Sequence, residues 1–218
     1  MTFCLTTTID KPEKNIQINQ AVILLHGYGG DGKDISILTL NWKRFLPNTI
    51  FLCPNGNEKC EINPAGYQWF DLTKDDPEYI LEQSKKAELN IKQFIEEVKS
   101  QYNLKNSQIC LSGFSQGCMM SINLGLTSNE NYNCVVGFSG KIINKKDLAN
   151  RKTSSTKMLL IHGDQDVVVS PTFLLEAKDF LIRNNVEIET KMISNCEHNI
   201  PVKASSAALN YIKNNFNI

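Results

Sequence analysis

Short apolar segments alternate along this chain with longer segments in which apolar residues recur every three or four positions. The short segments have few charged residues and a β-branched character, which is typical of strands buried on both faces of a parallel sheet. The predicted strands span 21–25, 49–53, 108–111, 134–138, 158–161 and 187–193, and the predicted helices span 35–46, 77–98, 118–126, 171–183 and 201–215. Strands separated by helices in this way predict an α/β fold, with a mostly parallel sheet and helices on both of its faces.

The length of the chain suits a single domain spanning residues 1–218, because one α/β core of this size buries enough surface to be stable. No internal repeat, low-complexity tract or linker divides it. The polar stretch 139–157, between two predicted strands, is too short for a large helical lid. We therefore expect one domain with an open site and no lid domain.

The charge balance and the start of the chain limit the classes of partner. Lys plus Arg and Asp plus Glu both total 23, and no basic block stands out, so a nucleic-acid partner is not expected. The first ten residues lack the basic and apolar regions of a signal peptide, and no apolar run reaches membrane-spanning length. These features predict a cytoplasmic protein without a transmembrane segment.

The seven cysteines are scattered, with no C-x-x-C pair and no Cys/His cluster at zinc spacing. An odd number of scattered cysteines without paired spacing is typical of free thiols in a reducing compartment. Cys53, Cys110 and Cys134 lie within apolar, strand-like runs, where a thiol packs as a small apolar group. We expect neither a metal site nor a cofactor.

Residues 113–117 read Gly-Phe-Ser-Gln-Gly and lie between a predicted strand and a predicted helix. A serine hydroxyl is a poor nucleophile at neutral pH, so a serine hydrolase holds it on a tight strand-to-helix turn within reach of a base. Glycines two positions before and after the serine let that turn form without a steric clash. The G-x-S-x-G pattern alone is a weak signal, because any glycine-rich turn with a serine matches it. Ser115 is therefore a candidate nucleophile whose partners must be found.

Three histidines are available as the base that would activate Ser115. His26 and His162 each lie at the end of a predicted strand and precede a glycine, where packing or shaping of the loop explains them. His198 lies in a polar loop before the last predicted helix, where an imidazole gains nothing from burial. The sequence therefore favours His198 as the base and leaves His26 and His162 as alternatives.

Two aspartates in the segment His-Gly-Asp-Gln-Asp at 162–166 are candidates for the acid. Either one also suits a turn, because aspartate side chains stabilise Asx-turns. The α/β-hydrolase order of serine, acid and histidine requires an acid between Ser115 and His198 in a loop that follows a strand, and this loop meets that requirement. Spacing alone does not separate Asp164 from Asp166.

Six segments, in this order, resemble the phospholipase/carboxylesterase family of α/β-hydrolases, which includes the acyl-protein thioesterases. They are L-H-G-Y-G-G-D-G at 25–32, C-P-N-G at 53–56, W-F-D at 69–71, G-F-S-Q-G at 113–117, H-G-D-Q-D at 162–166 and H-N-I at 198–200. The resemblance implies an α/β-hydrolase fold and a Ser115, Asp166 and His198 catalytic triad. It also implies that the backbone N–H groups of Tyr28 and Gln116 form the oxyanion hole.

Two positions depart from the family pattern. Cys118 stands where the family usually has a glycine, and Glu197 precedes the histidine where a smaller or apolar residue is usual. Neither change removes a reacting group. We expect Cys118 to pack in the core rather than to act as a second nucleophile.

The predicted activity is hydrolysis of carboxylic esters or thioesters through an acyl-enzyme intermediate on Ser115. The resemblance implies medium or long acyl chains on small esters, thioesters, acylated proteins or lysophospholipids. Trp69 and Phe70 are candidates to line an acyl groove, although aromatic residues at such positions are as often plain core. The protein is expected to act as a monomer or a homodimer.

Two other classes of function stay open. A serine peptidase on the same fold would need a domain that selects peptides, and the sequence shows none. A non-catalytic binding protein of this fold would be expected to lack a triad member, whereas Ser115, Asp166 and His198 are all present.

Overall fold

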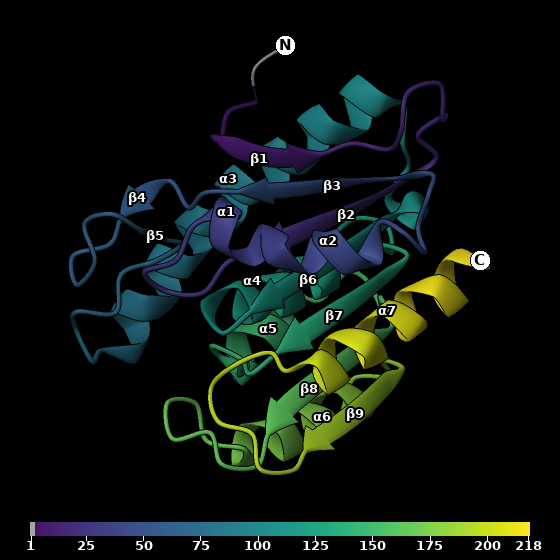
Figure 1. Cartoon of the computed structure of the whole chain (residues 1–218). Helices are drawn as coiled ribbons and strands as arrows, with labels where there is room; N and C mark the ends of the chain where they lie inside the picture. Colours follow the sequence, from purple (N-terminus) through teal and green to yellow (C-terminus); the bar gives the residue numbers. More distant parts are fainter. Residues whose placement is uncertain (1–2) are drawn as a thin grey trace.

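A seven-stranded sheet forms the centre of the computed structural model, which describes residues 3–218 (Figure 1). The strand order is β1-β3-β2-β6-β7-β8-β9, and every neighbouring pair is parallel except β1 with β3. The strands are β1 Thr7–Asp10, β2 Gln20–Leu25, β3 Thr49–Pro54, β6 Ile109–Phe114, β7 Cys134–Phe138, β8 Met158–Gly163 and β9 Ile188–Ile193. The predicted mostly parallel sheet is confirmed.

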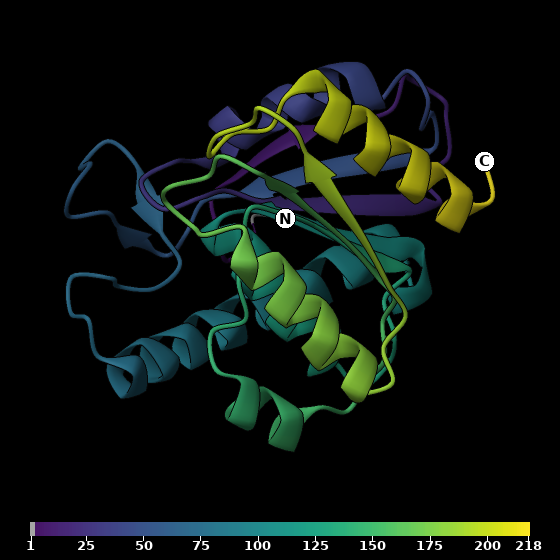
Figure 2. The ribbon, with the colours of Figure 1, turned by 90° about the horizontal axis from the view of Figure 1, so that it is seen from below.

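Helices cover both faces of the sheet, which is seen nearly edge-on in Figure 2. One face carries α1 Gly32–Ile35, α2 Thr39–Trp42 and α7 Val202–Phe216, and the other carries α3 Pro77–Tyr102, α4 Gln116–Leu126, α5 Lys145–Arg151 and α6 Thr172–Arg183. Successive strand residues feed the two separate cores: Ile23 packs in one and Leu24 in the other. This two-sided burial explains the unbroken apolar runs. Within residues 3–218, no helix has the length and apolarity to cross a membrane.

The structure corrects several element predictions. The predicted helix 35–46 begins earlier, at Gly32, because Asp31 caps it: Asp31 accepts from the N–H of Asp34, and the Asp34 carboxylate accepts from the N–H of Asp31. This helix tightens into a 3₁₀ turn at Ser36–Leu38 before α2 ends at Trp42. Three strands and one α-helix were not predicted from the sequence: the edge strand β1, the short strands β4 Glu58–Lys59 and β5 Tyr67–Gln68, and helix α5.

Helix α4 begins in direct contact with the central strands, and glycines make this contact possible. A Cβ atom on Gly117 would lie 2.1 Å from the carbonyl oxygen of Leu25, which ends β2. A Cβ atom on Gly113 would lie 2.3 Å from the carbonyl oxygen of Gly117. Backbone atoms on both sides leave no room for a side chain. The two glycines therefore fix how closely α4 sits against β2 and β6.

We predict that Gly117→Ala destabilises the fold by about 3 kcal/mol, because the new methyl group meets rigid backbone. Gly125→Ala in the same helix is the matched control. Its Cβ would meet the Val135 side chain at 2.7 Å and the Met158 side chain at 3.1 Å. These side chains can shift, so the expected cost is about 1 kcal/mol. Urea unfolding measures both, and equal losses of stability would contradict the role of the backbone contact.

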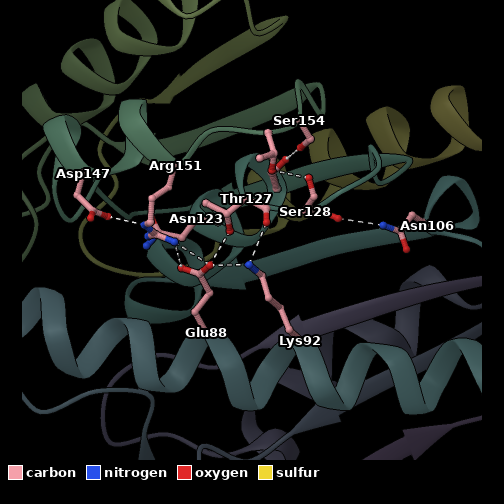
Figure 3. A network of polar contacts seen from close by, with 11 residues as sticks. Glu88, Lys92, Asn106, Asn123, Thr127, Ser128, Asp147, Arg151 and Ser154 are labelled. Atoms are coloured by element: carbon pink, nitrogen blue, oxygen red, sulfur yellow. Dashed lines mark hydrogen bonds and ion pairs between the residues drawn. The ribbon is translucent and has the colours of Figure 1, made fainter.

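A buried carboxylate on α3 is bonded to α5 and to the residue that caps the end of α4 (Figure 3). Glu88 is 3% exposed, and its oxygens accept from Arg151 at 3.0 and 3.1 Å, from Lys92 at 2.8 Å and from the Thr127 hydroxyl at 2.6 Å. Burial on its own raises the pKa of Glu88, but the hydrogen bonds from Arg151, Lys92 and Thr127 outweigh it and the pKa is lowered. The network therefore holds an ionised carboxylate inside the helical layer.

Because the pKa of Glu88 is lower in the folded chain, its contribution to stability is present above the ordinary carboxyl pKa and disappears as pH falls through the lowered value. We predict that Glu88→Gln lowers the free energy of unfolding at pH 7 by about 2 kcal/mol. The difference from wild type should shrink below about pH 4. Glu82→Gln, which removes an exposed pair with Lys86 on the same helix, should change little. Urea unfolding at pH values from 3 to 7 measures the free energy of unfolding. A loss of stability in Glu88→Gln that does not depend on pH would refute the prediction.

Candidate active site

Ser115 occupies the turn between β6 and α4 that the sequence predicts. Its φ of 52° and ψ of −114° are unusual for a residue with a side chain, and this strain costs about 1–3 kcal/mol. The N–H of Ser115 donates to the carbonyl of Phe138 on β7 at 2.8 Å, which ties the turn to the neighbouring strand. The backbone of Ser115 is therefore held in one place at the carboxyl end of the sheet, where α/β proteins bind ligands.

Asp166 and His198 are brought together by the loops after β8 and β9. Nδ1 of His198 lies 2.7 Å from Oδ2 of Asp166 and donates to it. The other carboxylate oxygen accepts from the N–H groups of Val168 at 3.0 Å and Val169 at 2.8 Å. Burial on its own raises the pKa of Asp166, but the hydrogen bonds from His198, Val169 and Val168 outweigh it and the pKa is lowered. The carboxylate is thus ionised and orients the imidazole.

The structure distinguishes the two aspartates that spacing left equivalent. Asp164 is exposed, and its carboxylate accepts from the N–H of Cys196 at 3.3 Å. Asp166 is 3% exposed and is the one bonded to His198. Only Asp166 is therefore placed to orient this histidine.

The two alternative bases, His26 and His162, are both buried, and their rings already form hydrogen bonds. Nε2 of His162 lies 2.8 Å from the Val169 carbonyl and 3.3 Å from Oδ2 of Asp166, so it braces the loop that holds Asp166. His26 is 1% exposed and bonds through both of its ring nitrogens. His198 is the histidine with a partly exposed side chain, at 17%. Its ring packs on that of Phe114, next to Ser115, with centroids 4.7 Å apart. Among residues 3–218, no hydrogen bond joins Ser115 and His198, a contact that often tightens only with substrate.

Tyr28 and Gln116 follow adjacent strands at the same level of the sheet. Leu25 pairs with Gly113 in parallel register, and Tyr28 and Gln116 each come three positions later. Gln116 is the first residue of α4, whose initial N–H groups have no acceptor within the helix. Within the part of the chain described, the Tyr28 N–H has no backbone acceptor either. Both N–H groups are free to bind a ligand oxygen.

A pocket of about 390 Å³ lies between the loop after β2 and the loop that carries His198. Its apolar walls, which the sequence reading missed, are Ile35, Ile37, Leu38, Phe114 and Ile200. Ile37 is 66% exposed, and a sequence does not show which apolar side chains stay uncovered, so it carried no signal for these walls.

Trp69 and Phe70 lie elsewhere. Both are 1% exposed and belong to the core on the α3 face, and neither lines this pocket. Their placement gives no support to an acyl groove at these residues, which stays a prediction.

The two departures from the family pattern lie in different surroundings. Cys118 is 2% exposed, and its sulfur occupies the space beside Gly137 and Gly140, where a Cβ atom would approach it to 2.4 and 2.5 Å. Burial raises the pKa of this thiol to about 12, so it packs as an apolar group. Cys53, Cys110 and Cys134 are buried as predicted. Glu197 is exposed at the rim of the site.

Known proteins resemble this chain over almost its whole length. The chain is 25% identical over 215 residues to the esterase YpfH of Escherichia coli (strain K12), which covers 94% of this chain and 86% of that protein. It is 26% identical over 200 residues to acyl-protein thioesterase 1 of Schizosaccharomyces pombe, which covers 87% and 86% of the two chains. The crystal structure of esterase PE8 matches with a TM-score of 0.91 and 31% identity, over 96% of this chain and 98% of that one.

The family model for phospholipases and carboxylesterases matches residues 7–216. This span includes the strained serine turn, the acid loop and the histidine loop described above. The α/β-hydrolase fold and this match lead to the same conclusion, that the chain belongs to the phospholipase/carboxylesterase family.

Proposed function

We propose that this chain hydrolyses carboxylic esters and thioesters, with Ser115 as nucleophile, His198 as base and Asp166 as the acid that orients it. The observation that carries the proposal is the 2.7 Å hydrogen bond from His198 to an ionised, buried Asp166 in the loop next to a strained serine turn. An esterase and an acyl-protein thioesterase among the relatives support the same class of reaction.

The bond to Asp166 sets the direction of proton transfer. In the neutral ring of His198 the proton is on Nδ1, where the carboxylate accepts it, so Nε2 has a free lone pair and takes the proton of the Ser115 hydroxyl as its oxygen attacks the acyl carbon. The imidazolium then gives this proton to the departing alcohol or thiol, leaving an acyl group on Ser115. Water repeats the sequence, with His198 again as base, and releases the acid.

The charge that develops on the acyl oxygen needs donors that are already in position. The N–H groups of Tyr28 and Gln116 supply them in this proposal, from adjacent strand ends. Such fixed donors stabilise the tetrahedral oxyanion without rearranging during the reaction, and each typically contributes about a hundredfold to a thousandfold in turnover.

The apolar pocket beside His198 supports a substrate with an apolar group. Its volume of about 390 Å³ is in the lower part of the range for small-molecule sites. Simple acyl esters and thioesters are the proposed substrates, with acylated proteins and lysophospholipids as the larger members of the class. A structure with a trapped long-chain phosphonate would show whether the chain enters this pocket or lies near Trp69 and Phe70.

We expect Ser115→Ala to reduce hydrolysis of p-nitrophenyl esters and of an acyl thioester to background, a loss of up to about a millionfold. The variant should also stop reacting with a fluorophosphonate probe. Ser139→Ala is a matched control, because Ser139 also has a positive φ, of 49°, and follows the next strand. It should keep its labelling. Hydrolysis that survives in Ser115→Ala would refute the proposal.

The two aspartates of the acid loop provide a second test. Asp166→Asn leaves a side chain of the same shape but removes the charge that orients His198, so kcat should fall by about 10⁴. Asp164→Asn changes an exposed side chain and should leave kcat within about twofold of wild type. Steady-state kinetics on a p-nitrophenyl ester measures both. A larger loss in Asp164→Asn would reassign the acid.

A further inference from the structure

Trp69 is bonded to both loops that carry the proposed oxyanion-hole donors. Its indole Nε1–H donates to the carbonyl of His26 at 2.9 Å, two residues before Tyr28. Its backbone N–H donates to Oε1 of the Gln116 side chain at 2.8 Å. Trp69 is 1% exposed, so these contacts are shielded from water. One buried residue therefore bridges the two strand ends.

His26 continues this bridge toward Tyr28. Its ring stacks on Trp69, with centroids 5.0 Å apart, and its Nε2 accepts from the N–H of Gly56 at 2.9 Å. Because that N–H can only donate, Nε2 carries no proton, and the proton of the neutral ring is on Nδ1. Burial also lowers the pKa of His26, which favours the neutral ring. Nδ1–H then donates to the carbonyl of Gly27 at 2.7 Å.

The carbonyl of Gly27 and the N–H of Tyr28 belong to one planar, trans peptide group, in which they point in opposite directions. His26 Nδ1 and the N–H of Gly30, at 3.0 Å, both donate to this carbonyl. Holding the carbonyl in place therefore holds the Tyr28 N–H as well. His26 and the N–H of Gly30 together set the direction of the first donor.

The second donor is held by its own side chain. Gln116 is 1% exposed, and its Nε2 donates to the carbonyl of Phe70 at 2.6 Å while its Oε1 accepts from Trp69. Both ends of the amide are thus bound to consecutive residues. This fixes the first residue of α4, whose N–H is the proposed donor.

We propose that Trp69, acting with His26, is a positioning residue that sets the direction and spacing of the Tyr28 and Gln116 N–H groups. This inference rests on the function proposed above and gives Trp69 a role in turnover without contact with substrate. A bridge of this kind affects stabilisation of the oxyanion, and so kcat, far more than binding of the uncharged substrate.

Trp69→Phe tests the bridge, because it keeps an aromatic ring and the backbone bond to Gln116 but removes the indole donor. We expect kcat to fall about tenfold, less than loss of a whole donor costs, with KM within about twofold. The affinity for a boronic acid inhibitor, which mimics the tetrahedral intermediate, should fall by the same factor as kcat/KM. Active sites are counted by labelling to completion with a fluorophosphonate.

Phe94→Leu is the matched control, since Phe94 is a fully buried aromatic residue of the same core that takes no part in the bridge or the proposed site. It should lower the melting temperature and leave kcat per active site unchanged. Equal kcat in Trp69→Phe, Phe94→Leu and wild type would overturn the proposal.

His26 is tested by two amides that replace different ring nitrogens. His26→Asn keeps a donor near Nδ1 and should retain more kcat than His26→Gln, whose amide lies near Nε2. Nitrogen-15 NMR of the wild-type imidazoles should show His26 as the Nδ1–H tautomer, and the Nε2–H tautomer would overturn the proposal even if no variant folds.

Hydrolysis that survives in Ser115→Ala refutes the proposed function instead. An inactive Ser115→Ala beside a fully active Trp69→Phe refutes the bridge alone.

Discussion

The parallel pairing of β2 with β6, and the contact of α4 with the end of β2, determine the geometry of the whole site. Leu25 and Gly113 are register partners, and Gly117 lies directly against the Leu25 carbonyl. The serine turn and the glycine-rich loop therefore start from one fixed level of the sheet. The strand that follows β2 in the chain, β3, lies on one side of β2, and β6 lies on its other side. The carboxyl ends of β2 and β6 are therefore the topological switch point, where α/β sheets bind ligands.

The cost of burying an ionisable group is offset in two different ways in this molecule. Glu88 and Asp166 stay charged, because several donors outweigh the cost of removing each carboxylate from water. His26 stays neutral, because its surroundings offer one acceptor and one donor and burial disfavours the cation. In the proposed mechanism, the charged state suits Asp166, which must stabilise an imidazolium, and the neutral state suits His26, whose ring must hold a fixed tautomer.

The central strands and the serine turn could be predicted from sequence because their signals are local. Six apolar runs and the spacing of Gly113, Ser115 and Gly117 required no knowledge of tertiary contacts. The half-exposed edge strand β1 and helix α5, which buries only Leu148, lack the apolar pattern that such a reading needs. Spacing does not separate Asp164 from Asp166; the family resemblance implied Asp166, and the structure shows that this residue is buried and bonds to His198. The sequence indicated that Trp69 is aromatic but not that its indole N–H binds the His26 carbonyl.

The segment between β3 and α3 explains why a strained serine turn is compatible with a rigid site. It bonds to His26 through Gly56 and Trp69, to Gln116 through Trp69 and Phe70, and to the glycine-rich loop through Asn63, whose amide donates to the Gly29 carbonyl at 2.7 Å. A turn held from one side only could relax its unfavourable φ. Here the relaxation would break hydrogen bonds in the core, so the strain persists in the folded state. The proposed oxyanion donors are then ordered when the chain folds, and the proposed reaction requires little reorganisation.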